Sequence, residues 1–539
     1  MFRPLPRSVT RPLSILVCIA WIASMAALIN RSYLQASASN LATDLSRYGS
    51  AASWHGVYYR GEKIGFTVSQ TVATDSGFEL QEDGRLQMTL LGATTPATIR
   101  TTARVDRAFA VRSFDFSLDP GTGPITVHGD LDGRTLVLTI ASRGGSRTER
   151  RELAEPPLLS VNFARRLASG GLTPGARYEW SVFDPATLRN APMIVSVGRR
   201  DVVTISNRPL PAFRVETEFA GLRTTSWVTD TGEVVREESP LGLLTVRETP
   251  ERARSMAVVR STRTDLLQGA AVVPAMRTRT RIDDPRDVRR LRVRLFGAEL
   301  PDADLRGGGQ SLDGDVLEMV DPQTLTAGPN DPTASQFLAP EPFIESDDPD
   351  IIAEAKKAVD GVTGTRARAE RLTRHVNGLI EKKLTVSLPS AREVLRTRVG
   401  DCNEHTALFV ALARAAGLPA RIAVGLVYVR GAFYYHAWPE VYLQEARNRG
   451  LWLPVDPTLN EFPADATHLR LARGGLDKQT AILPLVGRLR MTVLDLEVAP
   501  NTTPILVGAQ PLQINPAAVP ISRREATGCW FCCPRSDGR

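Results

Sequence analysis

Three residues of the types that build a nucleophilic site follow one another in the last third of the chain. Cys402 lies in the stretch GDCNEHT, His436 in YHAW and Asp456 in WLPVDPT. A thiol, an imidazole and a carboxylate in this order can form a Cys-His-Asp site for nucleophilic catalysis. Cys402 is also the only cysteine between residues 19 and 528, so it has no partner for a disulfide within that stretch. We therefore interpret Cys402 first as a reactive residue.

The surrounding pattern predicts the elements that must position these groups. Asp401 is a good cap for a helix that begins at Cys402 and ends near Gly417. A thiol in the first turn feels the positive end of the helix dipole, which favours the thiolate. Strand-like runs follow at 421–429, 433–443 and 451–455. The second carries His436, and the third delivers Asp456 at its end.

These stretches resemble the core of the transglutaminase-like superfamily, relatives of the papain-type cysteine proteases. The resemblance covers about 350–475 and rests on the segments GDCNEH, LFVALARAAGLPAR, HAWPEVY and WLPVDPT. It implies an α+β fold, in which the helix carrying the cysteine packs on an antiparallel sheet, with a catalytic domain over 349–475. It also implies that Cys402 is the nucleophile, His436 the base and Asp456 the orienting carboxylate. The implied chemistry acts on amides through a thioester, by hydrolysis or by acyl transfer to an amine, and we favour hydrolysis.

Each of these residues also has an alternative interpretation. Cys402 can be an inert buried cysteine, His436 a strand histidine with a satisfied ring, and Asp456 the start of a turn. His405, three residues after Cys402, can compete as the base or join Cys402 and His436 in a zinc site. We predict no metal and no cofactor, because Cys-x-x-His alone is weak ligand spacing and the chain has no EF-hand loop for calcium.

Histidines outside this site give weaker signals. We expect His375 to lie at the edge of a helical core, within a helix over 365–380. His55, His128 and His468 have no constellation of chemical groups around them in the sequence.

The N-terminus predicts a membrane segment. Arg3, Arg7 and Arg11 precede an apolar run from 12 to 29. We expect a cytoplasmic stub over 1–11 and a transmembrane anchor or signal segment over 12–30, with the body extracytoplasmic, as in a bacterial periplasm or at a cell surface. The competing interpretation is a cleaved signal peptide, with processing after Ala36-Ser37-Ala38, which would leave a secreted protein.

The rest of the chain predicts three further regions. Alternating apolar runs separated by turns indicate a β-rich extracytoplasmic region over 50–300, with a hairpin around Gly61-Glu62-Lys63. The Gly-, Pro- and Asp-rich stretch 301–348 predicts a linker. Residues 476–539 form a C-terminal extension and tail, in which 488–498 can add a strand to the body. The tail holds Cys529, Cys532 and Cys533, and three thiols leave a structural zinc site incomplete.

Composition limits the partners. The net charge of +7 is spread over 539 residues without a dense basic block, so we expect no nucleic-acid partner. We expect a protein or peptide amide as substrate and the membrane as a contact of the N-terminal helix. The alternative function is a non-catalytic envelope protein, with the β-rich region and the papain-like core as binding modules.

Overall fold

The computed structural model describes residues 52–499, apart from a set of internal gaps. The gaps are 91–92, 120–123, 143–144, 220, 241, 256–270, 279–280, 299, 301–303, 384–389, 475–481 and 483–484. The expected membrane segment over 12–30 and the three cysteines of the tail lie outside the described residues. Within the described part, no helix is long and apolar enough to cross a membrane.

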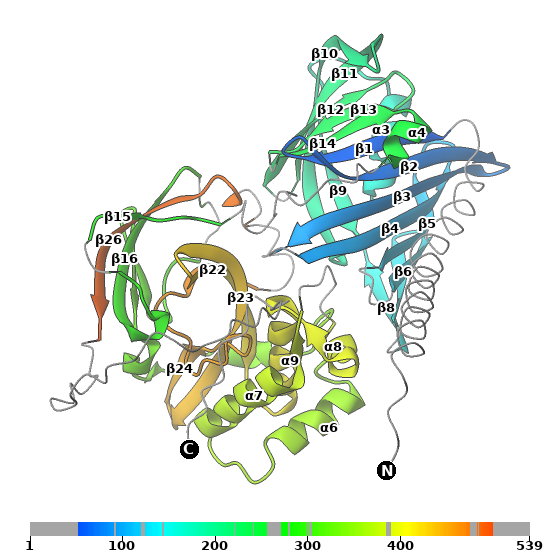
Figure 1. The fold of residues 1–539 in the computed structure, drawn as a ribbon. Helices are drawn as coiled ribbons and strands as arrows, with labels where there is room; N and C mark the ends of the chain where they lie inside the picture. Colours follow the sequence, from blue (N-terminus) through cyan, green and yellow to red (C-terminus); the bar gives the residue numbers. More distant parts are fainter. Residues whose placement is uncertain are drawn as a thin grey trace, which may run out of the picture.

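Residues 53–248 form one antiparallel sheet of 14 strands, as the alternating pattern predicted (Figure 1). The strand order is β8-β7-β6-β5-β4-β3-β2-β1-β14-β13-β12-β11-β10-β9, so that β1 and β14 join two meanders. The predicted hairpin connects β1 to β2 through Arg60 and Gly61, whose φ angles are 49° and 86°. Two positive φ angles are typical of a type I′ turn, which matches the twist of the strands. The elements are β1 Ser53–Tyr59, β2 Glu62–Thr74, β3 Gly77–Leu90, β4 Ala93–Asp106, β5 Val111–Asp119, β6 Ile125–Asp132, β7 Thr135–Ser142, β8 Gly145–Glu152, α3 Ser160–Ser169, β9 Arg177–Asp184, β10 Arg189–Ile205, β11 Arg208–Phe219, β12 Leu222–Val228, β13 Val234–Glu238, β14 Leu243–Glu248 and α4 Pro250–Arg254.

The stretch 301–348 was expected to be a linker, and its described part is instead folded into the body. Strands β17 and β18 pair with each other, and β18 pairs with β16. Glycine, proline and aspartate mark turns here, while apolar residues between them, such as Leu317 and Met319, are buried. The strand β26, as predicted within 488–498, completes this five-stranded sheet from the far end of the chain. The elements are β15 Ala275–Met276, η2 Pro285–Asp287, β16 Val288–Phe296, β17 Gln310–Asp313, β18 Val316–Val320, η3 Pro322–Thr324, η4 Ala334–Leu338 and β26 Arg490–Val498.

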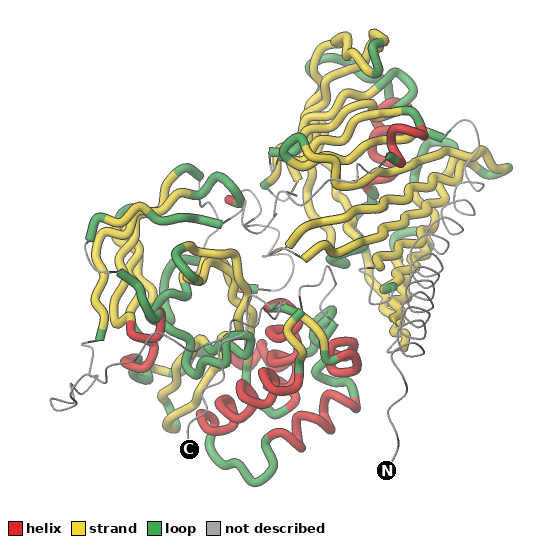
Figure 2. The backbone as a smooth tube through the Cα atoms, viewed as in Figure 1, coloured by secondary structure: helices red, strands yellow, loops and turns green. Residues whose placement is uncertain are grey.

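The region expected to be catalytic has three layers (Figures 1 and 2). Its central sheet has the order β19-β24-β23-β22-β25. One core joins this sheet to the helices, and a second core joins it to the sheet of β15, β26, β16, β18 and β17. The elements are β19 Gly328–Pro329, α6 Pro349–Ala358, α7 Thr365–Leu379, β20 Glu381–Lys382, α8 Ala391–Thr397, β21 Val399–Gly400, α9 Cys402–Ala415, β22 Ala420–Val429, β23 Ala432–Ala446, β24 Arg449–Pro454 and β25 Leu469–Arg473.

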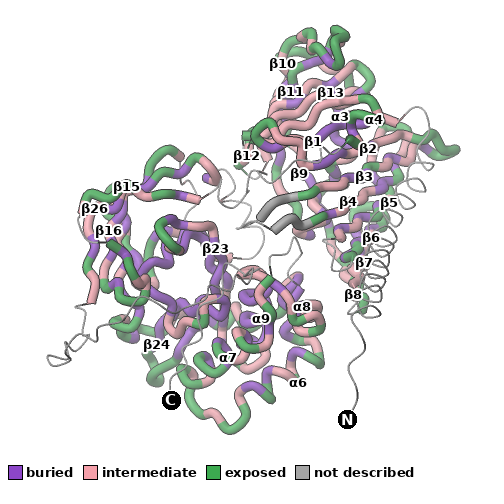
Figure 3. The backbone as a smooth tube through the Cα atoms, in the orientation of Figure 1, coloured by how far each residue is buried: buried purple, intermediate pink, exposed green. Residues whose placement is uncertain are grey.

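Helix α9 is the centre of this region. Residues Glu404 to Arg414 are all buried, so the helix is covered on every side (Figure 3). A helix that is buried all round can be apolar all round, and the run from Ala407 to Ala413 has no polar residue. The burial of the helix body holds the first turn in place, where Cys402 lies half-buried. The predicted helix over 365–380 is present as α7, which packs against α9.

Two neighbouring residues connect the β-rich region to the helical layer. Phe343 is buried in the core of strands β3 to β7, whereas Ile344 is buried in the core of the helices. The Phe343 carbonyl accepts a hydrogen bond from the Ala391 N–H at 2.9 Å, at the start of α8. Phe343 also has a φ of 69°, which is uncommon for an aromatic residue and requires support from both sides.

Candidate active site

The cysteine lies in the first turn of α9, and a capping box fixes that turn. The Asp401 carboxylate accepts the N–H of Asn403 at 3.0 Å, and the Glu404 carboxylate accepts the N–H of Asp401 at 2.8 Å. Gly400 makes this possible, because a Cβ at that position would lie 2.2 Å from the Cβ of Glu404. The predicted cap is therefore present, and it places Cys402 at a defined point at the end of the helix.

Two contacts with Ala437 hold this helix end against β23. Ala437 makes a backbone hydrogen bond with the Cys402 thiol. The Thr406 hydroxyl, one turn further along α9, donates to the Ala437 carbonyl at 3.0 Å. His436 precedes Ala437, so these contacts bring the thiol beside the strand segment that carries the imidazole.

The thiol of Cys402 is half-buried, and its surroundings favour the neutral form. Burial raises the pKa of the Cys402 thiol well above its usual value, and the nearby charges of Asp401 and Glu404 raise it further. The hydrogen bond with Ala437 opposes this rise. The helix dipole alone predicted a thiolate, and burial together with the acidic cap outweighs it. A thiol in this state needs a base before it can attack.

His436 and Asp456 form the pair that the sequence predicted. The Nε2 atom of His436 lies 2.7 Å from Oδ2 of Asp456, and both side chains are buried. Burial would raise the pKa of the Asp456 carboxyl, but His436 and His468 lower it well below its usual value. The other oxygen, Oδ1, accepts the N–H groups of Thr458 and Leu459 at 2.7 and 2.9 Å. Because Nε2 is engaged with Asp456, Nδ1 is the nitrogen of His436 that remains to exchange a proton with the thiol.

The strand that carries His436 is held by a buried ionic cluster around Glu440. This carboxylate is fully buried and pairs with Arg421 and Arg470 at 2.8 Å and with Arg473 at 2.7 Å. Burial would raise the pKa of Glu440, but the three guanidinium groups lower it to about 2. The four residues tie β22, β23 and β25 together four residues from His436.

His468 belongs to the site, although the sequence gave it no partners. Its Nε2 lies 3.1 Å from Oδ2 of Asp456, and its Nδ1 lies 3.1 Å from Oδ1 of Asp465. Glu461 is nearby, and its carboxylate accepts the N–H of Asp465 at 3.2 Å. The only sequence signal is the three-residue spacing from Asp465 to His468, which is typical of a local turn. The contact with Asp456 is tertiary, so spacing alone could not predict it.

His436, Asp456, His468 and Asp465 form a chain of hydrogen-bonded side chains. Among the described residues, two groups of possible metal ligands are close together, and both include His468. Of the alternative zinc site of Cys402, His405 and His436, only His436 belongs to one of these groups. The ligand atoms of His436 and Asp456 are 2.7 Å apart, whereas two ligands of a tetrahedral zinc ion lie about 3.4 Å apart.

His405, the alternative base, contacts the backbone of its own helix. Its Nδ1 lies 2.7 Å from the Asp401 carbonyl, within its own helix. Burial lowers the pKa of the His405 ring below its usual value. Its Nε2 is buried without a hydrogen-bond partner. His405 therefore supports the start of α9, and the charge of Asp456 acts on its ring without a hydrogen bond between the two side chains.

The remaining histidines lie apart from the site. His375 is partly buried and pairs with Glu354 at 2.7 Å, in agreement with a position at the core edge. His128 does have partners, contrary to expectation, since its ring lies between Asp115 and Asp130 on the exposed face of the β-rich sheet. The ring nitrogens lie 2.7 Å from Asp115 and 2.9 Å from Asp130, as in an ion-pair network on the surface.

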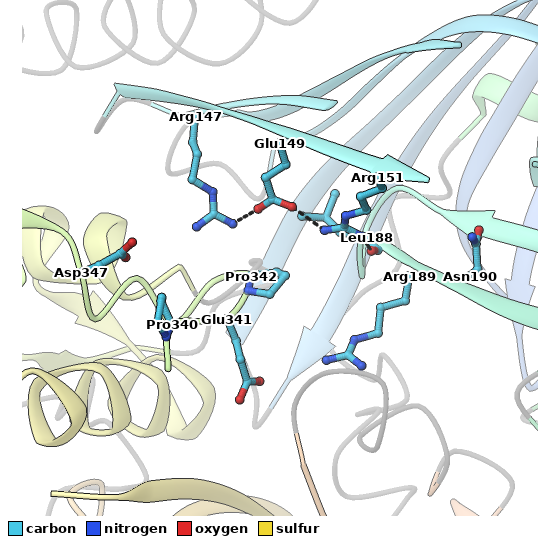
Figure 4. A pocket seen from close by; sticks show the side chains of 10 residues that line it. All are labelled: Arg147, Glu149, Arg151, Leu188, Arg189, Asn190, Pro340, Glu341, Pro342 and Asp347. Atoms are coloured by element: carbon cyan, nitrogen blue, oxygen red, sulfur yellow. Dashed lines mark hydrogen bonds and ion pairs between the residues drawn. The ribbon is translucent and has the colours of Figure 1, made fainter. Parts of the chain in front are cut away.

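A cavity of about 710 Å³ lies between the β-rich region and the segment 340–347 (Figure 4). Its walls carry three arginines and three carboxylates, and one of the carboxylates, Glu149, pairs with both Arg147 and Arg151. The cavity is not lined by Cys402, His436 or Asp456.

Comparisons with known proteins agree with this geometry for one part of the chain. Residues 353–457 match the family model of the transglutaminase-like superfamily. No curated protein matches the chain. The family match confirms the resemblance stated from the sequence motifs.

Three similar solved structures each cover between 32% and 39% of the chain. A β-barrel-like protein with a domain of unknown function from Brucella abortus is 11% identical, covers 36% of this chain and 94% of its own, and has a TM-score of 0.30. A candidate cysteine protease from Cytophaga hutchinsonii is 18% identical, covers 39% of this chain and 86% of its own, and has a TM-score of 0.24. A protein from a family of unknown function in Pseudomonas aeruginosa is 17% identical, covers 32% and 89%, and has a TM-score of 0.22.

The matched residues include α9 with Cys402, the strand with His436, and Asp456 two residues after β24. The helix packs on an antiparallel sheet, and the contacts at Ala437 and the pair of His436 and Asp456 lie within the match. Residues 353–457 of this chain are therefore a transglutaminase-like superfamily domain.

Proposed function

We propose that the chain is a cysteine enzyme that acts on amide bonds of a protein or peptide through a thioester on Cys402, with hydrolysis as the favoured outcome. The observation that carries this proposal is the buried pair of His436 and Asp456, 2.7 Å apart, beside the half-buried thiol at the start of α9. Each member of the site then has a separate role.

His436 acts as the base because the resting thiol is neutral. Its Nδ1 takes the proton of Cys402, and the sulfur attacks the amide carbonyl. Asp456 accepts from Nε2 and stabilises the imidazolium that forms. The negative oxygen of the tetrahedral intermediate needs donors, and the N–H of Cys402 at the helix start is in the position to supply one.

The second half of the reaction returns the site to its starting state. The imidazolium gives its proton to the leaving amine, the C–N bond breaks and the thioester remains. His436 then takes a proton from water, the hydroxide attacks the thioester, and the acid leaves as Cys402 recovers its proton. An amine in place of water would give acyl transfer, and hydrolysis has the simpler requirement because it needs no second substrate site.

A single-turnover acylation assay with an activated ester or amide tests the assignment. We expect folded Cys402→Ala to form no acyl-enzyme, and His436→Ala to be nearly as inactive, because it removes both the base and the later acid. Asp456→Asn should retain more activity than Cys402→Ala, since it disturbs only the orientation and tautomer of His436. His405→Ala tests the competing base and should remain acylated, with circular dichroism to verify the fold.

Two results would refute this function. One is full acylation of folded Cys402→Ala. The other is loss of acylation in His405→Ala with His436→Ala unaffected. An intact protein that neither forms an acyl-enzyme nor reacts with thiol-directed probes at neutral pH would instead favour the binding-protein alternative.

We also propose that the N-terminal segment anchors the protein in a membrane, with the body extracytoplasmic. The support is the sequence alone, namely the arginines at 3, 7 and 11 followed by the apolar run over 12–29. N-terminal sequencing of the mature protein tests it, and a start near Ser39 would show cleavage and secretion instead.

A further inference from the structure

The ring of His468 lies between two buried carboxylates. Its nitrogens are each 3.1 Å from an oxygen, one of Asp456 and one of Asp465. Asp465 Oδ1 also accepts the N–H and the hydroxyl of Thr467 at 2.7 and 2.6 Å. An oxygen that accepts several donors belongs to an ionised carboxylate, so both ring nitrogens of His468 must donate. His468 is therefore an imidazolium inside the protein.

Two histidines share one oxygen of Asp456. Oδ2 lies 2.7 Å from His436 and 3.1 Å from His468. The carboxylate does not need His468 to keep its orientation, because Oδ1 is held by the backbone N–H groups of Thr458 and Leu459. The contact of His468 therefore acts on Asp456 through its charge rather than by holding its orientation.

The charges of the cluster show in which direction the contact with His468 changes the electrostatics at His436. Burial, with the nearby charge of Asp465, raises the pKa of Glu461 to about 8, so Glu461 is mostly neutral at pH 7. Asp456, Asp465 and the His468 imidazolium then sum to one negative charge. Without the positive charge of His468, two negative charges would act on His436.

The other charged groups around the cluster have partners of their own. On β25, Arg470 is bound to Glu440 and to the carbonyls of Asp304, Arg306 and Gly307. On α9, Asp401 and Glu404 form the capping box near Cys402. Their charges are fixed by these contacts, which leaves His468 as the cation in direct contact with Asp456.

We propose that His468 is a positioning residue that acts on His436 through Asp456. Its positive charge offsets part of the negative charge of the Asp456 carboxylate, which limits how strongly that carboxylate stabilises protonated His436. The contact thereby weakens the bias of His436 towards its protonated form, as the role of a base requires. This inference rests on the proposed function of the Cys402 site.

The first test measures the charge of His468 directly. The full-length protein, labelled with ¹⁵N-histidine, has six histidines, and His468→Gln assigns the signal. We expect both ring nitrogens of His468 to be protonated from pH 6 to pH 8. A neutral ring at pH 7 would overturn the proposal, and this measurement needs no active variant.

The second test measures the effect on His436. A Cys402→Ala background removes the thiol, so that no proton exchange with sulfur complicates the signal of the His436 ring. Adding His468→Gln should raise the pH at which half of the His436 rings are protonated by about one unit, a tenfold change in equilibrium. His375→Gln is the matched control, because it removes a histidine paired with a glutamate outside the site, and it should produce no shift.

An unchanged or lowered midpoint in the folded His468→Gln variant would overturn the proposal. A purely structural role for His468 would change the melting temperature and leave the midpoint where it is. Both tests are independent of turnover. A wild-type protein without acylation activity would therefore refute the proposed function, while the titration would still decide the role of His468.

Discussion

At the scale of single residues, the site is governed by which buried groups carry charge. Cys402 is neutral because burial and its acidic cap outweigh the helix dipole, and Asp456 is ionised because two histidines and two backbone N–H groups face it. Glu461 is the carboxyl whose burial is least compensated. It offers a direct measurement of the electrostatics of this cluster.

Replacing Glu461 should alter how stability depends on pH. The pKa of Glu461 is raised to about 8 in the folded protein, from about 4.5 when unfolded. A raised pKa means that the folded state binds the extra proton, so its contribution to stability is complete below pH 4.5 and is lost as pH rises to 8. Glu461→Gln is always neutral, so it should lose less stability over this range, by on the order of a few kcal/mol at pH 8.

Denaturant unfolding at pH 5 and pH 8 measures this difference. Glu445→Gln is the control, because Glu445 lies on the surface and pairs with Arg366. Equal pH dependence of wild type and Glu461→Gln would show that Glu461 is not held neutral by the fold.

The residues that the sequence could predict were those with local signals. Asp401 caps the helix as expected, because a cap is recognised from its position directly before the first helical turn, and the structure adds Glu404 as its partner in a capping box. His436 and Asp456 are predicted from the ordered motifs around them. His468 depends on a contact across 12 residues, and nothing in its neighbourhood marked it as a partner of Asp456. The catalytic roles themselves stay predictions.

At the scale of elements, strand β25 places His468 only because β22 lets it approach closely. Gly425 lies on β22 opposite His436, and a Cβ there would come within 2.0 Å of the Leu469 carbonyl oxygen. The pairing of β22 with β25 also shifts its register at this point. A glycine is required because another backbone, rather than a flexible side chain, occupies the space.

Gly425→Ala should therefore displace β25 and destabilise the protein by about 1–3 kcal/mol, the usual cost of overpacking. Gly378→Ala is the matched control, because Gly378 is exposed in α7 and a Cβ there meets nothing within 4 Å. It should stabilise the protein by about 0.5–1 kcal/mol, since alanine favours a helix over glycine. Chemical denaturation compares the two, and a neutral Gly425→Ala would show that β25 is free to move.

The stretch 301–348 shows where composition misleads. Glycine, proline and aspartate report the density of turns, and they do not report whether the residues between the turns are packed. Gln310 makes this clear, because its side chain bonds the backbone of Leu305 and of Arg470, 160 residues away. Such a contact depends on β25 being in place, so no local pattern in 301–348 could predict it.

At the scale of the whole molecule, the β-rich region and the transglutaminase-like region meet at the segment around Phe343, and also where the Ser142 hydroxyl donates to Glu393 at 3.4 Å. Phe343 enters the core of the first and Ile344 the core of the second, and the two residues share a peptide bond. Further contacts support the junction, including the hydrogen bond from the Ser390 hydroxyl to Glu345 at 2.7 Å. We expect this junction to make the two regions unfold together.

Phe343→Ala and Ile344→Ala separate the two sides of the junction. Phe343→Ala should lower the stability of the β-rich region by about 3–5 kcal/mol, and Ile344→Ala that of the helical region by about 2–5 kcal/mol. Calorimetry should show one transition in the wild type and two in Phe343→Ala, with the earlier one from the β-rich region, because its anchor is lost. In Ile344→Ala the helical region should melt first. Two separate transitions already present in the wild type, unmoved by either substitution, would show that the junction does not couple the regions, and that the site around Cys402 depends on its own three layers alone.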